Sequence, residues 1–169
     1  MSKNGLSEKL RLGFISAVEV EGRGHIGGLL VTNHLGRPLE FQCTTPVRPD
    51  RTQEILYGRT LRPWLLGELI GKTLLNRVSI KPELIFVDDS DLLELRNHTS
   101  IPVACTAVDD RTSTKDLEGR RLRFHDSHDH DSEFLSEQLH LIPGQADLEE
   151  PLERVGEALN ETIRTVMAR

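Results

Sequence analysis

The fold is decided by residues 12–45, which read LGFISAVEVEGRGHIGGLLVTNHLGRPLEFQCTT. Three β-rich apolar stretches, residues 12–20, 25–32 and 38–45, are separated by two short segments that contain glycine. Glycine favours tight turns because it adopts positive φ without a steric cost. The stretch therefore predicts three strands joined by hairpin-length turns, which form an antiparallel meander.

Helices and strands alternate in the next part of the chain. Asp50 has the pattern of an N-cap, and Gln53 completes a capping box, so a helix is predicted over about residues 51–57. Apolar residues at helical spacing predict a second helix over about residues 60–78. The continuous apolar run at residues 84–87 is typical of a strand that is buried on both faces. Strands separated by helices are joined by parallel crossovers.

One domain that contains both kinds of connection has a mixed sheet with helices packed on it. After a short helix, a strand over residues 101–108 completes the predicted core of residues 12–108, which follows an N-terminal tail at 1–11. Apolar patterning is weak in residues 109–146, so we expect a polar connector rich in His and Asp. Residues 147–169 carry apolar side chains at every third or fourth position and predict an amphipathic helix. The predicted fold class is α/β (α+β).

Composition limits the classes of protein that the chain can belong to. The 169 residues are 37% hydrophobic and 28% charged, which suits one globular domain. Aromatic residues make up 4%, too few for platforms that stack single-stranded bases. No apolar run approaches the ~18 residues of a membrane span, and no apolar signal segment is evident. We therefore expect a cytoplasmic location, no membrane partner, and reduced thiols at Cys43 and Cys105.

The net charge of −6 is unevenly distributed. Residues 1–81 hold 12 Lys/Arg and 7 Asp/Glu, a charge of +5, whereas residues 82–169 hold 9 and 20, a charge of −11. An acidic half discourages contact with phosphate backbones. A nucleic-acid partner is therefore possible but not favoured by charge alone.

Four carboxylates lie at strand ends. Glu19 and Glu21 are near the end of the first predicted strand, and Asp88 and Asp89 follow the buried fourth strand. Carboxylates of this kind can hold the divalent ions that activate water and stabilise the leaving oxygen of a phosphodiester. Capping of the next helix is the other explanation for Asp88 and Asp89.

The order strand-strand-strand-helix-strand-helix-strand-helix over residues 12–108 resembles the ribonuclease-H-like fold, which endonuclease V and related nucleases share. That resemblance implies Mg²⁺ or Mn²⁺ bound by carboxylates on the first strand and at the tip of the fourth. The chain departs from the family because Glu19 and Glu21 lie at the end of the first strand, whereas the family usually has an Asp near its middle. A divergent metal-dependent nuclease, with catalytic Glu19, Glu21, Asp88 and Asp89, is the alternative hypothesis.

The tract His125-Asp126-Ser127-His128-Asp129-His130 offers further metal ligands. Imidazole and carboxylate groups bind zinc, nickel or copper. Structural zinc usually has ligands from rigid elements, whereas this tract lies in the weakly patterned connector. A metal site at His125, His128 and His130 is therefore a weaker hypothesis than adventitious binding.

A cluster of cationic and aromatic residues surrounds two predicted helix starts. Arg, Trp and Tyr dominate the energetic centres of protein interfaces, and arginines near helix starts can also hold phosphate. No P-loop, dinucleotide-binding glycine motif, Cys-x-x-Cys or nucleophile-elbow motif is present. The leading expectation is therefore a protein-interaction or assembly module without catalysis or cofactor, which binds a protein partner or itself. The expected partner-binding residues are Arg48, Arg51, Tyr57, Arg59, Arg62 and Trp64.

Overall fold

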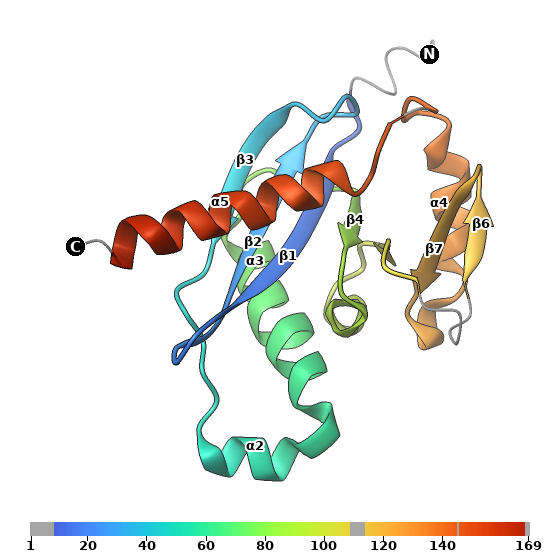
Figure 1. The fold of residues 1–169 in the computed structure, drawn as a ribbon. Coiled ribbons are helices and arrows are strands. Elements are labelled where there is room, and N and C mark those ends of the chain that lie inside the picture. The colour runs from blue at the N-terminus through green and yellow to red at the C-terminus, as the bar shows by residue number, and fades with distance from the viewer. Residues whose placement is uncertain (1–8, 109–113, 145, 168–169) are drawn as a thin grey trace.

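A computed structural model gives the fold of the chain and describes residues 9–108, 114–144 and 146–167 (Figure 1). The first eight residues of the expected N-terminal tail, and residues 109–113 and 145 of the expected connector, lie outside the described residues.

The centre of the molecule is a seven-stranded mixed sheet in the order β3-β2-β1-β4-β5-β7-β6. Strands β1, β2 and β3 pair antiparallel, β1 pairs parallel with β4 and β4 with β5, and β5, β7 and β6 are antiparallel again. The predicted meander and crossovers are thus confirmed, and the order is compatible with a ribonuclease-H-like sheet. The strands are β1 Leu12–Val20, β2 Gly24–Thr32, β3 Pro38–Cys43, β4 Leu84–Val87, β5 Val103–Cys105, β6 Lys115–Leu117 and β7 Arg120–Phe124.

Helices fill the connections where the spacing of apolar residues predicts them. The capping box is present: the Gln53 amide donates to Asp50 Oδ1 at 2.8 Å, and Gln53 Oε1 accepts from the Asp50 amide at 3.0 Å. The predicted helix over residues 60–78 is η2 followed directly by α3. The helical segments are α2 Arg51–Tyr57, η1 Gly58–Thr60, η2 Pro63–Ile70, α3 Gly71–Arg77, η3 Ser90–His98, η4 Asp126–His128, α4 Asp131–Leu139 and α5 Glu150–Met167.

Two apolar cores lie on the two faces of the sheet, because successive strand side chains point to opposite faces. On one face Phe14 and Phe86 stack with ring centroids 5.5 Å apart and pack with apolar residues of α4 and α5. On the other face Ile15 and Val87 pack with η2, α3 and η3. Helix α5 crosses the first face over β1 and β2, and η2 and α3 lie behind the sheet (Figure 1).

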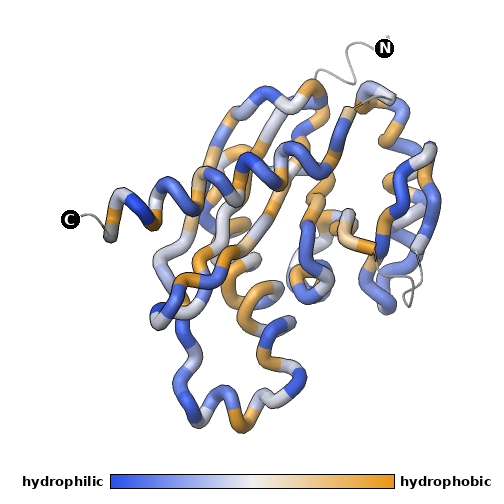
Figure 2. The backbone as a smooth tube through the Cα atoms, in the orientation of Figure 1, coloured by the Kyte–Doolittle hydropathy of each residue, from blue (hydrophilic) through white to orange (hydrophobic). Residues whose placement is uncertain are grey.

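Apolar residues concentrate in the strands and in η2 and α3, whereas α5 carries many hydrophilic residues (Figure 2). Helix α5 has 18 residues and buries one side while leaving its glutamates and Arg164 exposed. Among the described helices, none combines the length and the apolar composition needed to cross a bilayer.

The described part of the expected connector is structured rather than a plain polar loop. It forms β6, β7, η4 and α4, and Leu122 and Phe124 of β7 are buried in the same core as Leu135 and Leu139 of α4. Apolar side chains are sparse here, but tertiary contacts bury these four, whereas Phe134 is 44% exposed. The chain therefore gains two further strands from few apolar residues.

Candidate functional site at the ends of the parallel strands

Ser16 and Asp88 meet where two parallel strands lie side by side. Strand β1 pairs with β4 so that Ile15 is opposite Val87, which brings Ser16 alongside Asp88, the residue that follows β4. The Ser16 hydroxyl donates to Asp88 Oδ2 at 2.8 Å, and Ser16 is 5% exposed. The buried hydroxyl therefore holds one carboxylate oxygen of Asp88 in place.

This pair faces a pocket of about 490 Å³ between the sheet and α5. The floor of the pocket comes from β1 and from the ends of β4 and β5, and α5 forms the opposite wall. In open α/β sheets, ligands bind beyond the carboxyl ends of the parallel strands, which is where this pocket lies. The residues that line it are Ser16, Ala17, Val18, Asp88, Thr106, Ala107, Glu149, Leu152, Glu153 and Gly156.

The charge of the pocket is negative. Glu149 directly precedes α5 and Glu153 lies in its first turn, and both are exposed. Burial raises the pKa of Asp88; the Ser16 hydrogen bond opposes that effect, and the charge of Asp89 adds to it. Although Asp88 is exposed as a residue, the loss of water around its carboxylate disfavours the ionised form relative to a fully solvated aspartate. A bound cation would reverse that preference.

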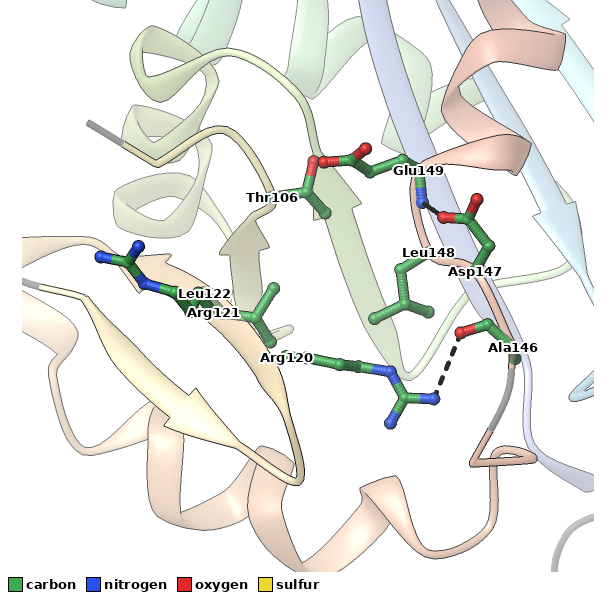
Figure 3. A pocket seen from close by; sticks show the side chains of 8 residues that line it. All are labelled: Thr106, Arg120, Arg121, Leu122, Ala146, Asp147, Leu148 and Glu149. Atoms are coloured by element: carbon green, nitrogen blue, oxygen red, sulfur yellow. Dashed lines mark hydrogen bonds between the residues drawn. The ribbon is translucent and has the colours of Figure 1, made fainter. Parts of the chain in front are cut away.

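A second pocket of about 190 Å³ adjoins the first and shares Thr106 and Glu149 with it (Figure 3). Arg120 and Arg121 of β7 line this second pocket. Arg120 Nη2 donates to the carbonyls of Pro143 at 2.9 Å and of Ala146 at 3.3 Å, so its guanidinium is held against the segment that enters α5. The carboxylates of the first pocket and the two arginines of β7 thus line adjoining pockets.

The oxygen-only donors of the first pocket suit a hard cation such as Mg²⁺ or Mn²⁺. Within the described ranges, however, no three His, Cys, Asp or Glu side chains come together as a group that could hold a metal ion. Mg²⁺ in enzymes is commonly bound by one or two carboxylates together with phosphate oxygens of the substrate. The donors therefore fit an ion that the protein and a phosphate ligand share.

The four carboxylates expected at the strand ends do not converge. Glu19 is exposed and lies three residues beyond Ser16, which puts it on the opposite face of β1, and Glu21 lies in the turn before β2. Asp89 points away from Asp88: it accepts from the Asp91 amide at 2.9 Å and pairs with Arg62 at 3.2 Å. Only Asp88 of the four lines the pocket, because adjacent strand residues alternate between faces.

Sequence reasoning missed Ser16, Thr106, Glu149 and Glu153. The β1–β4 register decides that Ser16 faces Asp88, and that register is a contact between residues far apart in sequence. The glutamates had a local signal, since Glu149 and Glu153 are four residues apart and share one face of a helix. Their place in one pocket with Asp88 depends on how α5 packs across β1.

The expected partner-binding residues lie next to the β1–β2 turn, on α2 and η1, and around the start of η2. Tyr57 and Trp64 stack with ring centroids 4.2 Å apart, and Arg62 pairs with Asp89 and Asp91. Arg48 donates to the Gly22 carbonyl at 2.9 Å, next to the β1–β2 turn. Two further members lie on α2 and η1: Arg51 pairs with Glu54 at 3.2 Å, and Arg59 is exposed.

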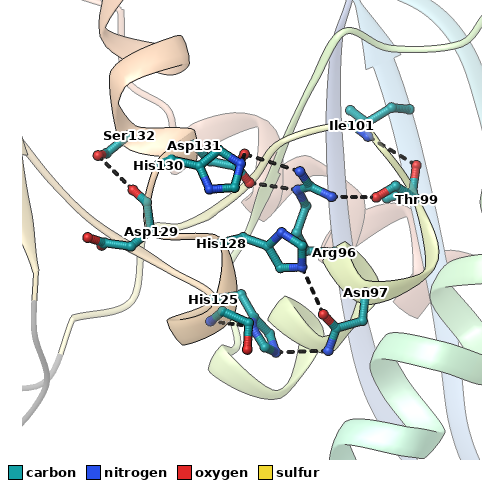
Figure 4. A network of polar contacts seen from close by, with 11 residues as sticks. Arg96, Asn97, Thr99, Ile101, His125, His128, Asp129, His130, Asp131 and Ser132 are labelled. Atoms are coloured by element: carbon teal, nitrogen blue, oxygen red, sulfur yellow. Dashed lines mark hydrogen bonds and ion pairs between the residues drawn. The ribbon is translucent and has the colours of Figure 1, made fainter.

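The three histidines of the expected metal tract make polar contacts with residues of η3 and α4 (Figure 4). His125 Nε2 lies 3.3 Å from Glu94 Oε2, and His128 Nε2 lies 2.9 Å from Asn97 Oδ1. His130 lies 3.6 Å from Asp131, which pairs with Arg96 at 2.7 Å. The described histidines thus hold η4 and α4 against η3, and they are not among any group that could hold a metal.

No protein-family model and no curated protein matches the sequence. Among solved structures, the chain is similar to human ENDOV, with 12% identity, a TM-score of 0.46, and coverage of 94% of this chain and 86% of that one. It is also similar to Marinitoga piezophila Argonaute in complex with 5' OH guide RNA, with 16% identity, a TM-score of 0.34, and coverage of 66% and 19%. For the same Argonaute with guide RNA and target DNA, the values are 12%, 0.38, 90% and 29%.

These similarities concern the fold alone, and this chain spans less than a third of the Argonaute. The expectation of a protein-interaction or assembly module without catalysis is contradicted, since the solved structures that the chain resembles are ENDOV and an Argonaute in complex with RNA and DNA. The alternative hypothesis, a divergent nuclease, agrees better with them.

Proposed function

We propose that this chain is a divergent, divalent-metal-dependent nuclease whose site is the acidic pocket between β1, β4, β5 and α5. The observation that carries the proposal is the buried Ser16 hydroxyl, which fixes Asp88 in a pocket that Glu149 and Glu153 also line. Glu19, Glu21 and Asp89 have no part in it, because they lie outside that pocket.

Asp88 is the residue that would hold Mg²⁺ or Mn²⁺ together with a substrate phosphate, and Glu149 and Glu153 would add negative charge across the pocket. When bound, such an ion supplies an activated water and stabilises the oxygen that leaves the phosphorus. The chain's own part is to orient the ligands: Ser16 restrains Asp88, and Asp147 Oδ1 accepts from the Glu149 amide at 2.8 Å, which positions the start of α5.

A polymeric phosphodiester fits the two adjoining pockets better than an isolated phosphate does. Arg120 and Arg121 lie beside the acidic pocket, and guanidinium groups bind phosphate oxygens through fixed forks of N–H donors. A nucleic acid that has one phosphate at the carboxylates can place a neighbouring phosphate near the arginines. We therefore propose nucleic acid as the substrate class.

The decisive experiment incubates purified protein with end-labelled single- and double-stranded DNA and RNA, with Mg²⁺, with Mn²⁺ or with a chelator. We expect cleavage of at least one substrate only when metal is present. Asp88→Asn removes the anionic ligand but keeps the side-chain shape, so it is expected to lower the cleavage rate by about 100-fold or more.

Glu153→Gln tests the α5 side of the pocket, and Glu157→Gln is its matched control. Both residues are exposed glutamates one turn apart on α5, but only Glu153 lines the pocket. We expect Glu153→Gln to weaken cleavage and Glu157→Gln to retain it. The proposal fails if no substrate is cut with either metal, or if Asp88→Asn is as active as the wild type.

A further inference from the structure

Gly156 lies in the interior of α5 at a position where packing does not require glycine. A Cβ built at Gly156 would meet no atom within 4 Å. At Gly67 a Cβ would lie 2.7 Å from Glu94 Cβ, and at Gly28 it would lie 3.0 Å from a Val155 methyl group, so close packing accounts for those glycines. Glycine is among the least favourable residues inside a helix. Gly156 therefore lowers the stability of α5, and no close packing contact explains why a glycine is there.

The space left by Gly156 is part of the acidic pocket. Gly156 shares a helix face with Glu149, Leu152 and Glu153, and all four line that pocket. Val18 and Leu152 supply apolar groups to the lining, and Glu153 lies one turn before Gly156 on α5. The pocket thus combines carboxylates with apolar walls.

We infer that Gly156 is a specificity-determining position that admits an unpaired base of a single-stranded nucleic acid to the pocket, beside the apolar side chains of Val18 and Leu152. This inference rests on the proposed nuclease function and names its substrate class. A base has two apolar faces with a polar edge, and a pocket of about 490 Å³ lies within the ~300–1,000 Å³ range of ligand pockets. A base stacked inside a duplex cannot enter such a pocket without leaving the stack.

The geometry explains how a base could be held without aromatic platforms. Aliphatic side chains at Val18 and Leu152 can contact a base face, and the Thr106 hydroxyl lies in the lining as a polar group. A side chain at position 156 would project into the same space. A larger residue there is therefore expected to exclude the base while leaving the carboxylates untouched.

The test measures equilibrium binding by fluorescence anisotropy, with Ca²⁺ as the divalent ion. The probes are a labelled single-stranded oligothymidylate and an abasic oligomer of equal length, which has the same phosphates but no bases. We expect the wild type to bind the intact strand at least about 10-fold more tightly. Gly156→Leu is expected to remove this preference, so that it binds both probes as the wild type binds the abasic one.

Asn160→Leu is the matched control, because Asn160 is exposed on the next turn of α5 and does not line the pocket. It should keep the wild-type preference. Gly156→Ala is expected to raise the Tm by roughly 2–4 °C, because alanine favours the helix and meets no neighbour. Far-UV circular dichroism and Tm measurements establish that each variant is folded.

Two results overturn the inference while the nuclease proposal stands: cleavage with equal wild-type affinity for both probes, or Gly156→Leu with an unchanged preference. The comparison of probes on the wild type decides the matter even if Gly156→Leu does not fold. If the wild type neither binds nor cleaves any nucleic acid, the proposed function fails and this inference fails with it.

Discussion

The Ser16 hydroxyl donates a hydrogen bond of 2.8 Å to a carboxylate oxygen of Asp88, a residue 72 positions further along the chain. Ser16 is buried and Asp88 faces the pocket, so this bond links the sheet interior to the site. A hydrogen bond from a neutral donor stabilises the ionised carboxylate. It thereby opposes the burial that raises the pKa of Asp88.

Ser16→Ala is expected to raise the pKa of Asp88 further, because it removes the bond and leaves the burial in place. A metal ligand must be ionised, so cleavage is lost as the pH falls through the pKa of Asp88. The acid limb of the pH–rate profile should therefore move to higher pH in Ser16→Ala. Ser16→Thr restores the hydroxyl and should return the limb toward the wild-type position, and an unmoved limb in Ser16→Ala contradicts the assignment.

Arg96 and Asp131 form a nearly buried ion pair that joins η3 to α4. Their side chains are 13% and 4% exposed, with Nε and Oδ2 2.7 Å apart. Arg96→Met leaves an unpaired buried carboxylate and is expected to destabilise the fold by about 3–5 kcal/mol in urea titrations. Arg62→Met breaks two partly exposed pairs, with Asp89 and Asp91, and should cost less, about 1 kcal/mol per pair at most. Equal losses in the two variants would contradict this ranking.

Gly67→Ala should destabilise the protein although alanine favours helices. The added Cβ would lie 2.7 Å from Glu94 Cβ and 2.9 Å from the Leu95 amide nitrogen, where η2 packs on η3. Overpacking of this kind costs about 1–3 kcal/mol. Thermal and urea unfolding should therefore show a loss for Gly67→Ala, and a gain there would mean that the contact between η2 and η3 is looser than described.

The two thiols should differ in reactivity. Burial raises the pKa of Cys105 to about 11, so little thiolate forms near neutral pH, and the residue is fully buried. Cys43 is half-buried on the edge strand β3. A disulfide reagent at pH 8 should label Cys43 first and Cys105 only after unfolding. Mass spectrometry of the labelled peptides measures this order, and rapid native labelling of Cys105 would contradict it.

Local signals were sufficient for much of the fold. The Asp50–Gln53 capping box lies within four residues, and the meander is marked by turn glycines and β-rich stretches, so both are readable from the sequence. Strand β7, by contrast, has no local signal in the sequence that predicts it. The segment Arg120–Phe124 contains only two apolar residues. It forms a strand because Leu122 and Phe124 pack in the core shared with α4 and α5.

The sequence by itself determined the order of the principal elements, because strand alternation, helical spacing and caps act over a few residues. It also marked Asp88 as a carboxylate at the tip of a buried strand. Only the tertiary structure decided that Ser16 bonds to Asp88 and that Glu149 and Glu153 line the same pocket, while Glu19 and Asp89 do not. The physical reason is that a one-residue change of register sends a strand side chain to the other face. Long-range pairing of β1 with β4 and packing of α5 set that register.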